Sequence, residues 1–310
     1  MGTIQMNGSE PKTSSEAQQY TYKYPRPSVT VDTLVFTVAQ RERLSYRNLP
    51  DNKLQLLLIK RKNAPYAGTW ALPGGFVEMD EDLRTAAQRE LWEETGLQPG
   101  YFGQLYTYGE VDRDPRGRVI STAYLAVVEK SGAQVQAGDD AGEAAWFDLN
   151  CDLEKVDSQS QGNGIEYHWQ IRLRLTDGVE NLSALLRITR FIDGCASMIK
   201  REIVDSDGLA FDHARIIEYG IEMLRHKLKY TDLLFKLVPE YFTLTQLQKV
   251  YETIMGKHVP RASFRRNIAD RVLETEQFVT QGGHRPSRLY QFNPRWLERP
   301  LQEGVVDLWS

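Results

Sequence analysis

The chain has 310 residues, of which 41% are hydrophobic and 26% are charged, and its formal net charge is −4. This composition excludes a wholly disordered chain, and the sequence has no apolar run long enough to span a bilayer. The length leaves room for two domains. Two cysteines, Cys151 and Cys195, are too few for a disulfide framework or a structural zinc site. We therefore expect a cytoplasmic protein that does not associate with membranes.

The first part of the chain predicts a flexible arm followed by a mixed α/β domain. Residues 1–27 are polar and lack the apolar block of a signal peptide. Runs rich in β-forming residues follow at 29–38 and 54–62, and a Pro-Gly-Gly break stands at 73–75. After a helix-like stretch come three more β-like segments, at 102–111, 119–129 and 144–149. Strands arranged around a helix are typical of an α/β fold that begins near residue 28.

The helix-like stretch reads GGFVEMDEDLRTAAQRELWEETGL and places three carboxylates near its C-terminal end: Glu90, Glu93 and Glu94. Spacings of three and four residues bring them onto overlapping faces of one helix, where like charges repel. The negative end of the helix dipole adds a cost of about 0.3–1 kcal/mol for each mismatched charge. A divalent cation would remove both penalties, and carboxylate oxygens suit Mg²⁺ or Mn²⁺. The pattern therefore predicts a metal site.

The spacing of this stretch resembles the Nudix box at each defined position, from Gly75 through Glu81 to the Arg89-Glu90-Leu91 and Gly96-Leu97 pairs. The resemblance implies a Nudix-fold α/β/α sandwich that hydrolyses a diphosphate with Mg²⁺ or Mn²⁺. It implies that Arg89 holds a carboxylate in place and that the metal is bound by these residues: Gly75, Glu90, Glu93 and Glu94. A solvated amphipathic helix, or a Nudix domain that binds without hydrolysing, would share part of the pattern.

A second segment, GEVDRDPRGRVIS, resembles the RDPRGR segment of Nudix domains that act on ADP-ribose. Guanidinium groups suit phosphates and ribose hydroxyls, and their planes stack on bases. We expect ADP-ribose or a related nucleoside diphosphate sugar to contact the arginines of this segment: Arg113, Arg116 and Arg118. A charged hairpin turn with local ion pairs is the alternative. Upstream, Arg61 stands beside the loop APYAGTWALPGG and would contact the same ligand or merely pack. Farther on, Asp140 or Glu143 stands in a loop where relatives keep a further acidic group.

Residues 151–207 look like a β-rich insertion in a Nudix domain that spans 28–238. The insertion begins with the flexible-looking SQSQGNG and continues into a strand in which Ile165, Tyr167 and Trp169 alternate with polar neighbours. A TDG turn precedes SALLRITRFI, which predicts a partner strand. The sequence assigns the insertion no function. From Asp212 to about Val238 a helical pattern predicts a linking helix that ends at Pro239.

The last part of the chain, 239–310, resembles a winged helix-turn-helix domain followed by a tail. Between Tyr241 and Arg295 nine Lys or Arg residues face four Asp or Glu residues, a net charge of +5, so the rest of the chain carries −9. A helix closed by Gly256, a second helix that starts near Pro260 and a hairpin follow one another. We expect contacts with duplex DNA from the second helix and the wing: Arg261, Ser263, Arg265, Arg266, Asn267, Arg285 and Arg288. A protein-docking module is the alternative.

A Nudix domain followed by a winged helix resembles the NrtR-type bacterial regulators, and the segments LAFDHARIIE and SFRRNI strengthen the likeness. The resemblance implies a homodimeric regulator of NAD metabolism that reads a DNA palindrome and responds to ADP-ribose. Three hypotheses remain: a hydrolase with a regulatory tail, a ligand-sensing repressor with slow or no turnover, and a housekeeping hydrolase whose tail docks protein.

Overall fold

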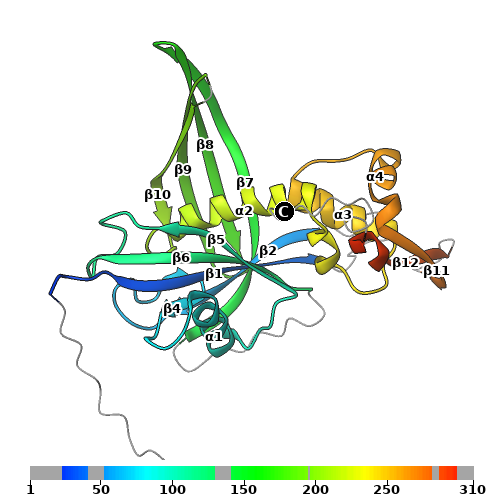
Figure 1. Cartoon of the computed structure of the whole chain (residues 1–310), viewed down its shortest axis with the longest axis horizontal. Coiled ribbons are helices and arrows are strands. Elements are labelled where there is room, and N and C mark those ends of the chain that lie inside the picture. The colour runs from blue at the N-terminus through cyan, green and yellow to red at the C-terminus, as the bar shows by residue number, and fades with distance from the viewer. Residues whose placement is uncertain (1–22, 41–51, 130–140, 195, 281–285, 299–310) are drawn as a thin grey trace, which may run out of the picture.

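The structure, a computed structural model, describes residues 23–40, 52–129, 141–194, 196–280 and 286–298. Its centre is one mixed sheet in which the strands lie in the order β10-β9-β8-β7-β2-β1-β6-β5 (Figure 1). The pairing of β1 with β6 is parallel and the other pairings are antiparallel. The first six strands are β1 (Ser28–Gln40), β2 (Asn52–Arg61), β3 (Trp70–Ala71), β4 (Gly74–Phe76), β5 (Tyr101–Tyr108) and β6 (Val119–Val127).

Two helices cover opposite faces of this sheet, which confirms the α/β/α sandwich. Helix α1 (Leu83–Thr95) buries Ala86, Ala87 and Leu91 against one face. Helix α2 (His213–Tyr230) buries its apolar face, including Ile217 and Ile221, against the other. Strand residues alternate between the two sides, as the period of two requires. The helices therefore lie on opposite sides of the same strands (Figure 1).

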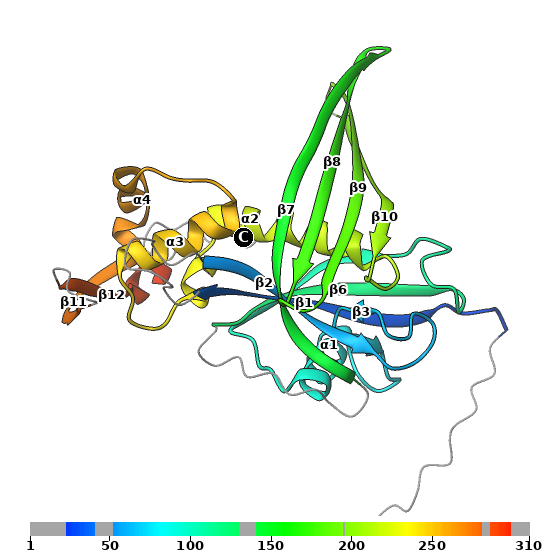
Figure 2. The same ribbon diagram turned by 180° about the vertical axis from the view of Figure 1, so that it is seen from behind.

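The insertion extends the central sheet instead of forming a separate unit. Its strands are β7 (Ala141–Gln161), β8 (Gly164–Thr176), β9 (Asn181–Asp193) and β10 (Ala196–Asp207). The tall part of these four strands, which we call the blade, rises beyond the sandwich, and α2 crosses its base (Figure 2). The expected boundary at residue 151 lies inside β7. The segment expected to be flexible is also largely strand, because Ser158, Gln159 and Ser160 pair with β8.

The two faces of the blade differ. Strand register places Val156, Trp169 and Ile188 on one face, which near its base packs against α2. The other face carries cross-strand ion pairs, such as Arg172 with Glu154 at 3.0 Å. Alternation of apolar and polar residues thus separates the two faces, but the apolar face of β8 is buried only at Leu173 and Leu175, near the base, whereas Ile165 is 43% exposed.

The linking helix is shorter than expected. Helix α2 ends at Tyr230, where the Thr231 hydroxyl and backbone N–H both donate to the Lys227 carbonyl. A separate 3-10 turn, η2 (Leu233–Leu237), completes the segment before Pro239. Apolar residues continue through both elements, so the hydrophobic pattern alone does not mark the break. No helix among the described residues has the length and apolar character needed to cross a membrane.

The C-terminal part is the expected winged helix. Thr243 caps α3 (Leu244–Met255) with a capping box, and Gly256 closes it in the left-handed conformation. Helix α4 (Arg261–Ile268) starts directly after Pro260, and η3 (Ala269–Arg271) leads into the wing of β11 (Val272–Val279) and β12 (Ser287–Phe292). A last turn, η4, spans Pro294–Glu298. One hydrophobic core runs from the sheet through α2 into α3 and α4.

Candidate functional site

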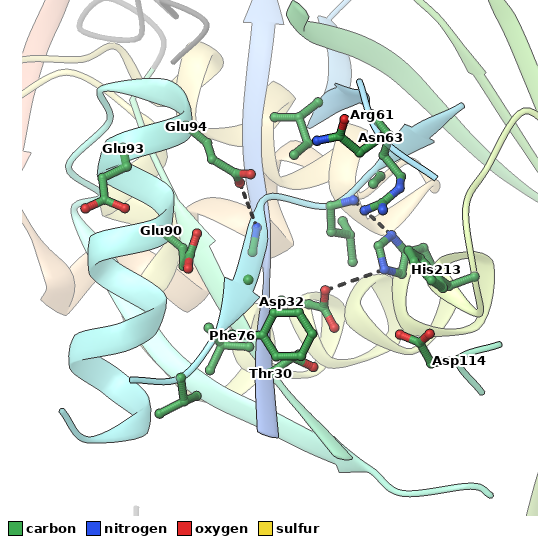
Figure 3. A pocket seen from close by; sticks show the side chains of 18 of the residues that line it. Thr30, Asp32, Arg61, Asn63, Phe76, Glu90, Glu93, Glu94, Asp114 and His213 are labelled. Atoms are coloured by element: carbon green, nitrogen blue, oxygen red, sulfur yellow. Dashed lines mark hydrogen bonds and ion pairs between the residues drawn. The ribbon is translucent and has the colours of Figure 1, made fainter. Parts of the chain in front are cut away.

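A cleft of about 790 Å³ lies beside the C-terminal half of α1. Its walls come from α1, from the β4 turn, from the segment after β2, from residues 113–116 and from the start of α2 (Figure 3). This volume is within the roughly 300–1,000 Å³ range of small-molecule sites. The Nudix-like helix α1, the arginine-rich segments and the residues at the start of α2 therefore lie around one cleft.

Helix α1 is fixed at both ends by local sequence. The Asp82 side chain accepts a hydrogen bond of 2.8 Å from the Thr85 N–H, which caps the N-terminus. Gly96 ends the helix with φ of 69°, a left-handed conformation that glycine adopts without a Cβ penalty. Burial of Leu91 sets the rotation of the helix, so Glu90 and Glu94 turn toward the cleft (Figure 3).

The two glycines at the start of β4 are required by close contacts. A Cβ atom on Gly74 would lie 2.1 Å from the Val31 carbonyl oxygen, because β4 pairs tightly with β1. A Cβ atom on Gly75 would lie 2.3 Å from Oε1 of Glu90. The glycine pair thus lets the backbone approach both the sheet and the carboxylate of α1.

Glu90 and Glu94 flank this glycine turn. Oε2 of Glu94 accepts a hydrogen bond of 2.8 Å from the Gly74 N–H. The Glu90 side chain is 15% exposed, and burial raises its pKa while Arg89 opposes the shift. The raised pKa indicates that the neighbours of this carboxylate compensate its negative charge only in part. A cation in the cleft would supply the missing positive charge.

Arg89 connects α1 to the segment that precedes it. Its guanidinium donates to Glu81 at 2.7 Å, to Glu90 at 2.9 Å and to Glu93 at 3.0 Å. It also donates to the Phe76 carbonyl oxygen. The hydrogen bond to Glu81 is the largest cause that raises the pKa of Arg89. Arg89 therefore contacts three carboxylates of this region, and the positioning role that the resemblance implies stays a prediction.

The donors in this region suit Mg²⁺ or Mn²⁺ by their chemistry. Glu90 and Glu94 provide hard carboxylate oxygens beside the Gly75 backbone, and the close Gly75–Glu90 contact forms a cradle that a Cβ would fill. Glu93 is 55% exposed and engaged by Arg89. Among the residues that the structure describes, no three acidic, His or Cys side chains converge closely enough to hold an ion. Mg²⁺ usually takes one or two carboxylates together with substrate phosphates, so two facing carboxylates suffice.

Comparison with known proteins identifies two domains along the chain. The NUDIX domain profile matches residues 19–161, and the profile of the NrtR DNA-binding winged helix domain matches residues 234–292. The chain is 31% identical over 296 residues to the ADPR responsive transcriptional repressor NtrR of Acinetobacter baylyi, and the match covers 92% of each protein. The chain belongs to the NrtR family of Nudix proteins.

Solved structures agree with the NrtR assignment. A MutT/nudix family protein from Enterococcus faecalis matches with a TM-score of 0.59 and 29% identity, over 89% of this chain and 90% of that one. Shewanella oneidensis NrtR complexed with a 27mer DNA matches with a TM-score of 0.54 and 27% identity, over 86% and 94%. Over 127 residues the chain is 46% identical to an ADP-ribose pyrophosphatase of Methanocaldococcus jannaschii, and this match covers 41% of this chain and 65% of that protein.

Three of the four predicted substrate-binding arginines line the cleft of this NrtR protein. Arg61 and Arg116 stand at the cleft wall. Arg113 also lines it, but its side chain is 5% exposed and pairs with Asp212 at 2.8 Å. Arg118 does not reach the cleft, because its guanidinium donates to the Glu110 carbonyl oxygen beside a smaller hollow.

Of the two further acidic groups expected near residue 140, the structure describes only Glu143, which does not line the cleft. Glu143 lies 4.0 Å from Lys60, with its side chain 55% exposed, and it is not among the residues that line the cleft. Asp140 lies outside the described residues. These two acids remain unassigned.

Sequence reasoning missed the contribution of the linker to the cleft. Phe211 and His213, at the start of α2, line it together with Asp32 of β1. Nδ1 of His213 accepts a hydrogen bond of 2.9 Å from the Leu72 N–H, and its Nε2 lies 3.5 Å from Asp32. The only signal was the LAFDHARIIE segment, which resembled the family but gave no hint of its partners in space.

The predicted DNA-contacting residues lie mostly on one helix. Arg265, Arg266 and Asn267 are exposed on α4, while Phe264 and Ile268 point into the core. Arg261 is exposed at the first position of the helix and Ser263 is half-buried. On the wing, Arg288 pairs with Glu274, and Arg285 lies outside the described residues. The helix thus presents a basic outer surface and an apolar inner one.

Proposed function

We propose that this protein is a transcriptional regulator that binds ADP-ribose in its Nudix cleft and duplex DNA with its winged helix. The observation that carries the proposal is the shared helix α2: its first residue, His213, lines the cleft, and Arg225 toward its other end donates a hydrogen bond to α3 of the DNA-binding domain. Its 18 residues span about 27 Å at 1.5 Å per residue. The A. baylyi relative is named an ADP-ribose-responsive repressor, which supports the same pairing of ligand and DNA.

We further propose that the cleft hydrolyses the diphosphate of its ligand with Mg²⁺ or Mn²⁺. When bound, such an ion neutralises phosphate charge and activates water. Glu90 and Glu94 would hold it with the Gly75 backbone, and Arg89 would keep the carboxylates in place. Glu93, which lies nearest to solvent, would join as a ligand or as a base when Arg89 releases it. The relative named ADP-ribose pyrophosphatase supports this chemistry.

The protein would recognise DNA through α4. Its exposed Arg261, Arg265 and Arg266 are suited to phosphates and base edges of the major groove, with Asn267 and Ser263 beside them. Arg288 would add a contact from the wing. A regulator of this type reads two half-sites, which requires two copies of the chain related by a two-fold axis.

The apolar face of the blade supports a homodimer. Leu153, Val156, Ile165 and Ile199 lie on this face and are 43–58% exposed. Tyr167 and Trp169 stack between them at 5.6 Å. The face continues the surface that α2 covers near the base and includes one exposed arginine, Arg190, whereas the opposite face carries several ion pairs. Two copies stacked face to face would form a self-complementary interface and bury these side chains.

The experiment that tests the function compares the parent with Glu94→Gln. Products of ADP-ribose are measured with Mg²⁺, and binding of ADP-ribose is measured by calorimetry. We expect AMP and ribose 5-phosphate from the parent and a large loss of turnover in Glu94→Gln. Binding without turnover in the parent would identify a sensor in place of an enzyme. No binding of ADP-ribose at all would reject the proposed ligand.

A further inference from the structure

Side chains from both edges of the central sheet meet on helix α2. Strands β10 and β5 stand at opposite ends of the strand order. The ring centroid of Tyr106, on β5, lies 5.6 Å from that of Tyr219 on α2, and the guanidinium of Arg201, on β10, lies 4.7 Å from the same Tyr219 ring. The sheet is therefore curved enough for both of its edges to contact one side of α2, and the base of the blade reaches the helix that leads to the DNA-binding domain.

Arg201 pairs with two carboxylates of α2 that are one helical turn apart. Its Nε–H donates to Glu218 at 2.8 Å, and its terminal nitrogen donates to Glu222. The Arg201 side chain is 15% exposed and the Glu218 side chain is 6% exposed, so this ion pair is largely withdrawn from water. A planar guanidinium that binds two carboxylates at once restricts both the rotation of a helix and its position along its axis.

The arginine stands where packing alone would favour an apolar residue. Strand register places Arg201 on the apolar face of the blade, opposite Ile188, and α2 packs there mainly through buried apolar side chains. Replacement of a buried ion pair by apolar residues of similar size is often neutral or stabilising, so stability does not explain the pair with Glu218. Buried polar and charged groups are best known for fixing the register of helices. The pair therefore points to a role in the position of α2.

Helix α2 connects to the cleft before the Arg201 pair and to the winged helix after it. Asp212, directly before its first residue, accepts a hydrogen bond of 2.8 Å from the cleft residue Arg113. Toward its other end, Arg225 donates to the Ile254 carbonyl oxygen of α3. Coupling between two sites requires an element with alternative positions that both sites bias. Helix α2 contacts both sites, and the pair from the blade restricts its position between them.

We propose that Arg201 is a positioning residue that links the blade to the response of the DNA-binding domain. By holding Glu218 and Glu222, it keeps α2 in a defined rotation and register against β10. A ligand in the cleft then shifts α2 between defined positions, and the winged helix moves with it. Without the ion pair, apolar packing holds α2 without a fixed register, and the ligand loses control of DNA affinity. This inference rests on the proposed function, because it assigns the regulation of the same cleft and DNA-binding domain.

The alternative is that the pair only stabilises the fold, and two double variants separate these roles. Arg201→Met/Glu218→Met replaces both partners by apolar side chains, so no unpaired charge stays buried at these two positions. Arg172→Gln/Glu154→Gln is the control, because it removes an ion pair of similar length, 3.0 Å, from the opposite face of the blade. A role in stability alone predicts that a well-folded methionine variant responds to the ligand like the parent.

The test measures the affinity for a labelled DNA duplex by fluorescence anisotropy, with and without saturating ADP-ribose. Calorimetry of ADP-ribose binding and a thermal melt accompany each protein. For the parent and the control, we expect ADP-ribose to change DNA affinity by about 5-fold or more. For the methionine variant, we expect a melting temperature no lower than that of the parent and the same affinity for ADP-ribose, with a change in DNA affinity below about 2-fold.

Each outcome decides the inference. A methionine variant that keeps the full change in DNA affinity would overturn it while the proposed function stands. A control that also loses the change would overturn it, because any ion pair of the blade would then have the same effect. If ADP-ribose binds the parent but leaves its DNA affinity unchanged, the proposed regulation and this inference are both wrong.

A second variant decides the matter if the methionine variant does not fold. Arg201→Lys keeps the positive charge but loses the planar fork that binds two carboxylates. We expect it to fold, to bind ADP-ribose like the parent and to show a smaller change in DNA affinity. The full change of the parent in Arg201→Lys would overturn the inference.

Discussion

Nδ1 of His213, the first residue of α2, accepts a hydrogen bond of 2.9 Å from the backbone N–H of Leu72. Leu72 lies two residues before Gly74, whose N–H bonds to Glu94. A short chain of contacts therefore joins the carboxylate side of the cleft to the helix that leads to the DNA-binding domain. At its other end α2 uses Arg225, which donates to the Ile254 carbonyl oxygen of α3 at 2.8 Å.

This link predicts the effect of changes at His213. Replacement by Ala leaves the buried Leu72 N–H without its acceptor, which costs about 1–3 kcal/mol. We expect His213→Ala to lower the free energy of unfolding by this amount and to weaken the effect of ADP-ribose on DNA affinity. The matched variant is His213→Asn, whose side-chain oxygen can take the place of Nδ1. It should restore part of the free energy of unfolding and part of the effect of ADP-ribose on DNA affinity. Chemical denaturation and DNA titrations measure the two effects. Equal behaviour of Ala and Asn would show that the hydrogen bond is not what matters.

The glycine turn predicts a loss of activity in Gly75→Ala. An added Cβ would stand 2.3 Å from Glu90 Oε1 and must push that carboxylate away. Displacement of a reacting group by about 1 Å can cost about 100-fold in rate, so we expect a loss of at least that size in turnover of ADP-ribose. Gly100→Ala is the control, because its Cβ would meet other atoms only at 3.9 Å. Near-parental turnover in Gly75→Ala would remove Glu90 from the proposed machinery.

Helix α4 predicts a specific effect on DNA. We expect Arg265→Ala and Arg266→Ala each to weaken binding of a mixed-sequence duplex and to reduce the salt dependence of binding by about one unit of slope. Turnover of ADP-ribose should not change, since both residues lie in the other domain. Arg187→Ala, at an exposed position on β9, is the control for loss of a positive charge. An unchanged salt slope in both α4 variants would favour a docking partner other than DNA.

The blade predicts the oligomeric state. We expect the parent to sediment as a dimer and Val156→Asp to sediment as a monomer, because a charge would have to be buried in an interface made mostly of apolar side chains. Asp157→Asn, on the adjacent exposed position, changes charge outside the apolar face and should leave the dimer intact. A parent that is monomeric at micromolar concentration, or a dimeric Val156→Asp, would contradict the assignment of this face.

Burial of Glu218 predicts a pH effect on stability. Burial raises the pKa of Glu218 above its usual value of 4.5, and the ion pair with Arg201 at 2.8 Å opposes the shift only in part. A carboxyl whose pKa is raised in the folded protein contributes least to the free energy of unfolding when it is ionised. Its contribution therefore falls as the pH rises from the pKa of the unfolded chain through that of the folded protein. We expect Glu218→Gln to flatten this part of the stability profile. Denaturation midpoints at several pH values measure it, and parallel profiles would refute it.

The sequence predicted those parts of the fold whose determinants are local. Fixed spacings around Arg89 identified α1, and Gly256 with Pro260 located the break between α3 and α4. The α2–η2 break was missed because a Thr231 hydrogen bond ends the helix, while the apolar pattern runs on. The polar edge strand β10 was also missed, since its residues read KREIVDSD and carry no clear alternation.

The cleft was only half predictable for a related reason. Its carboxylates come from one helix, so their spacing was visible in the sequence. The partners from the linker are distant, since 141 positions separate Leu72 from His213. Only folding brings Phe211 beside Arg61. Likewise, only folding joins Arg113, which is expected to contact the ligand, to Asp212, 99 positions away.

The central claim is that a ligand in the Nudix cleft changes DNA binding through α2. The most direct measurement is the fluorescence anisotropy of a labelled duplex as ADP-ribose is added, before turnover depletes it, with calorimetry on the same sample. The account predicts that saturating ADP-ribose shifts DNA affinity by about 5-fold or more, the usual range of allosteric coupling. An unchanged DNA affinity, at ADP-ribose concentrations where calorimetry shows that the cleft is filled, would contradict this claim.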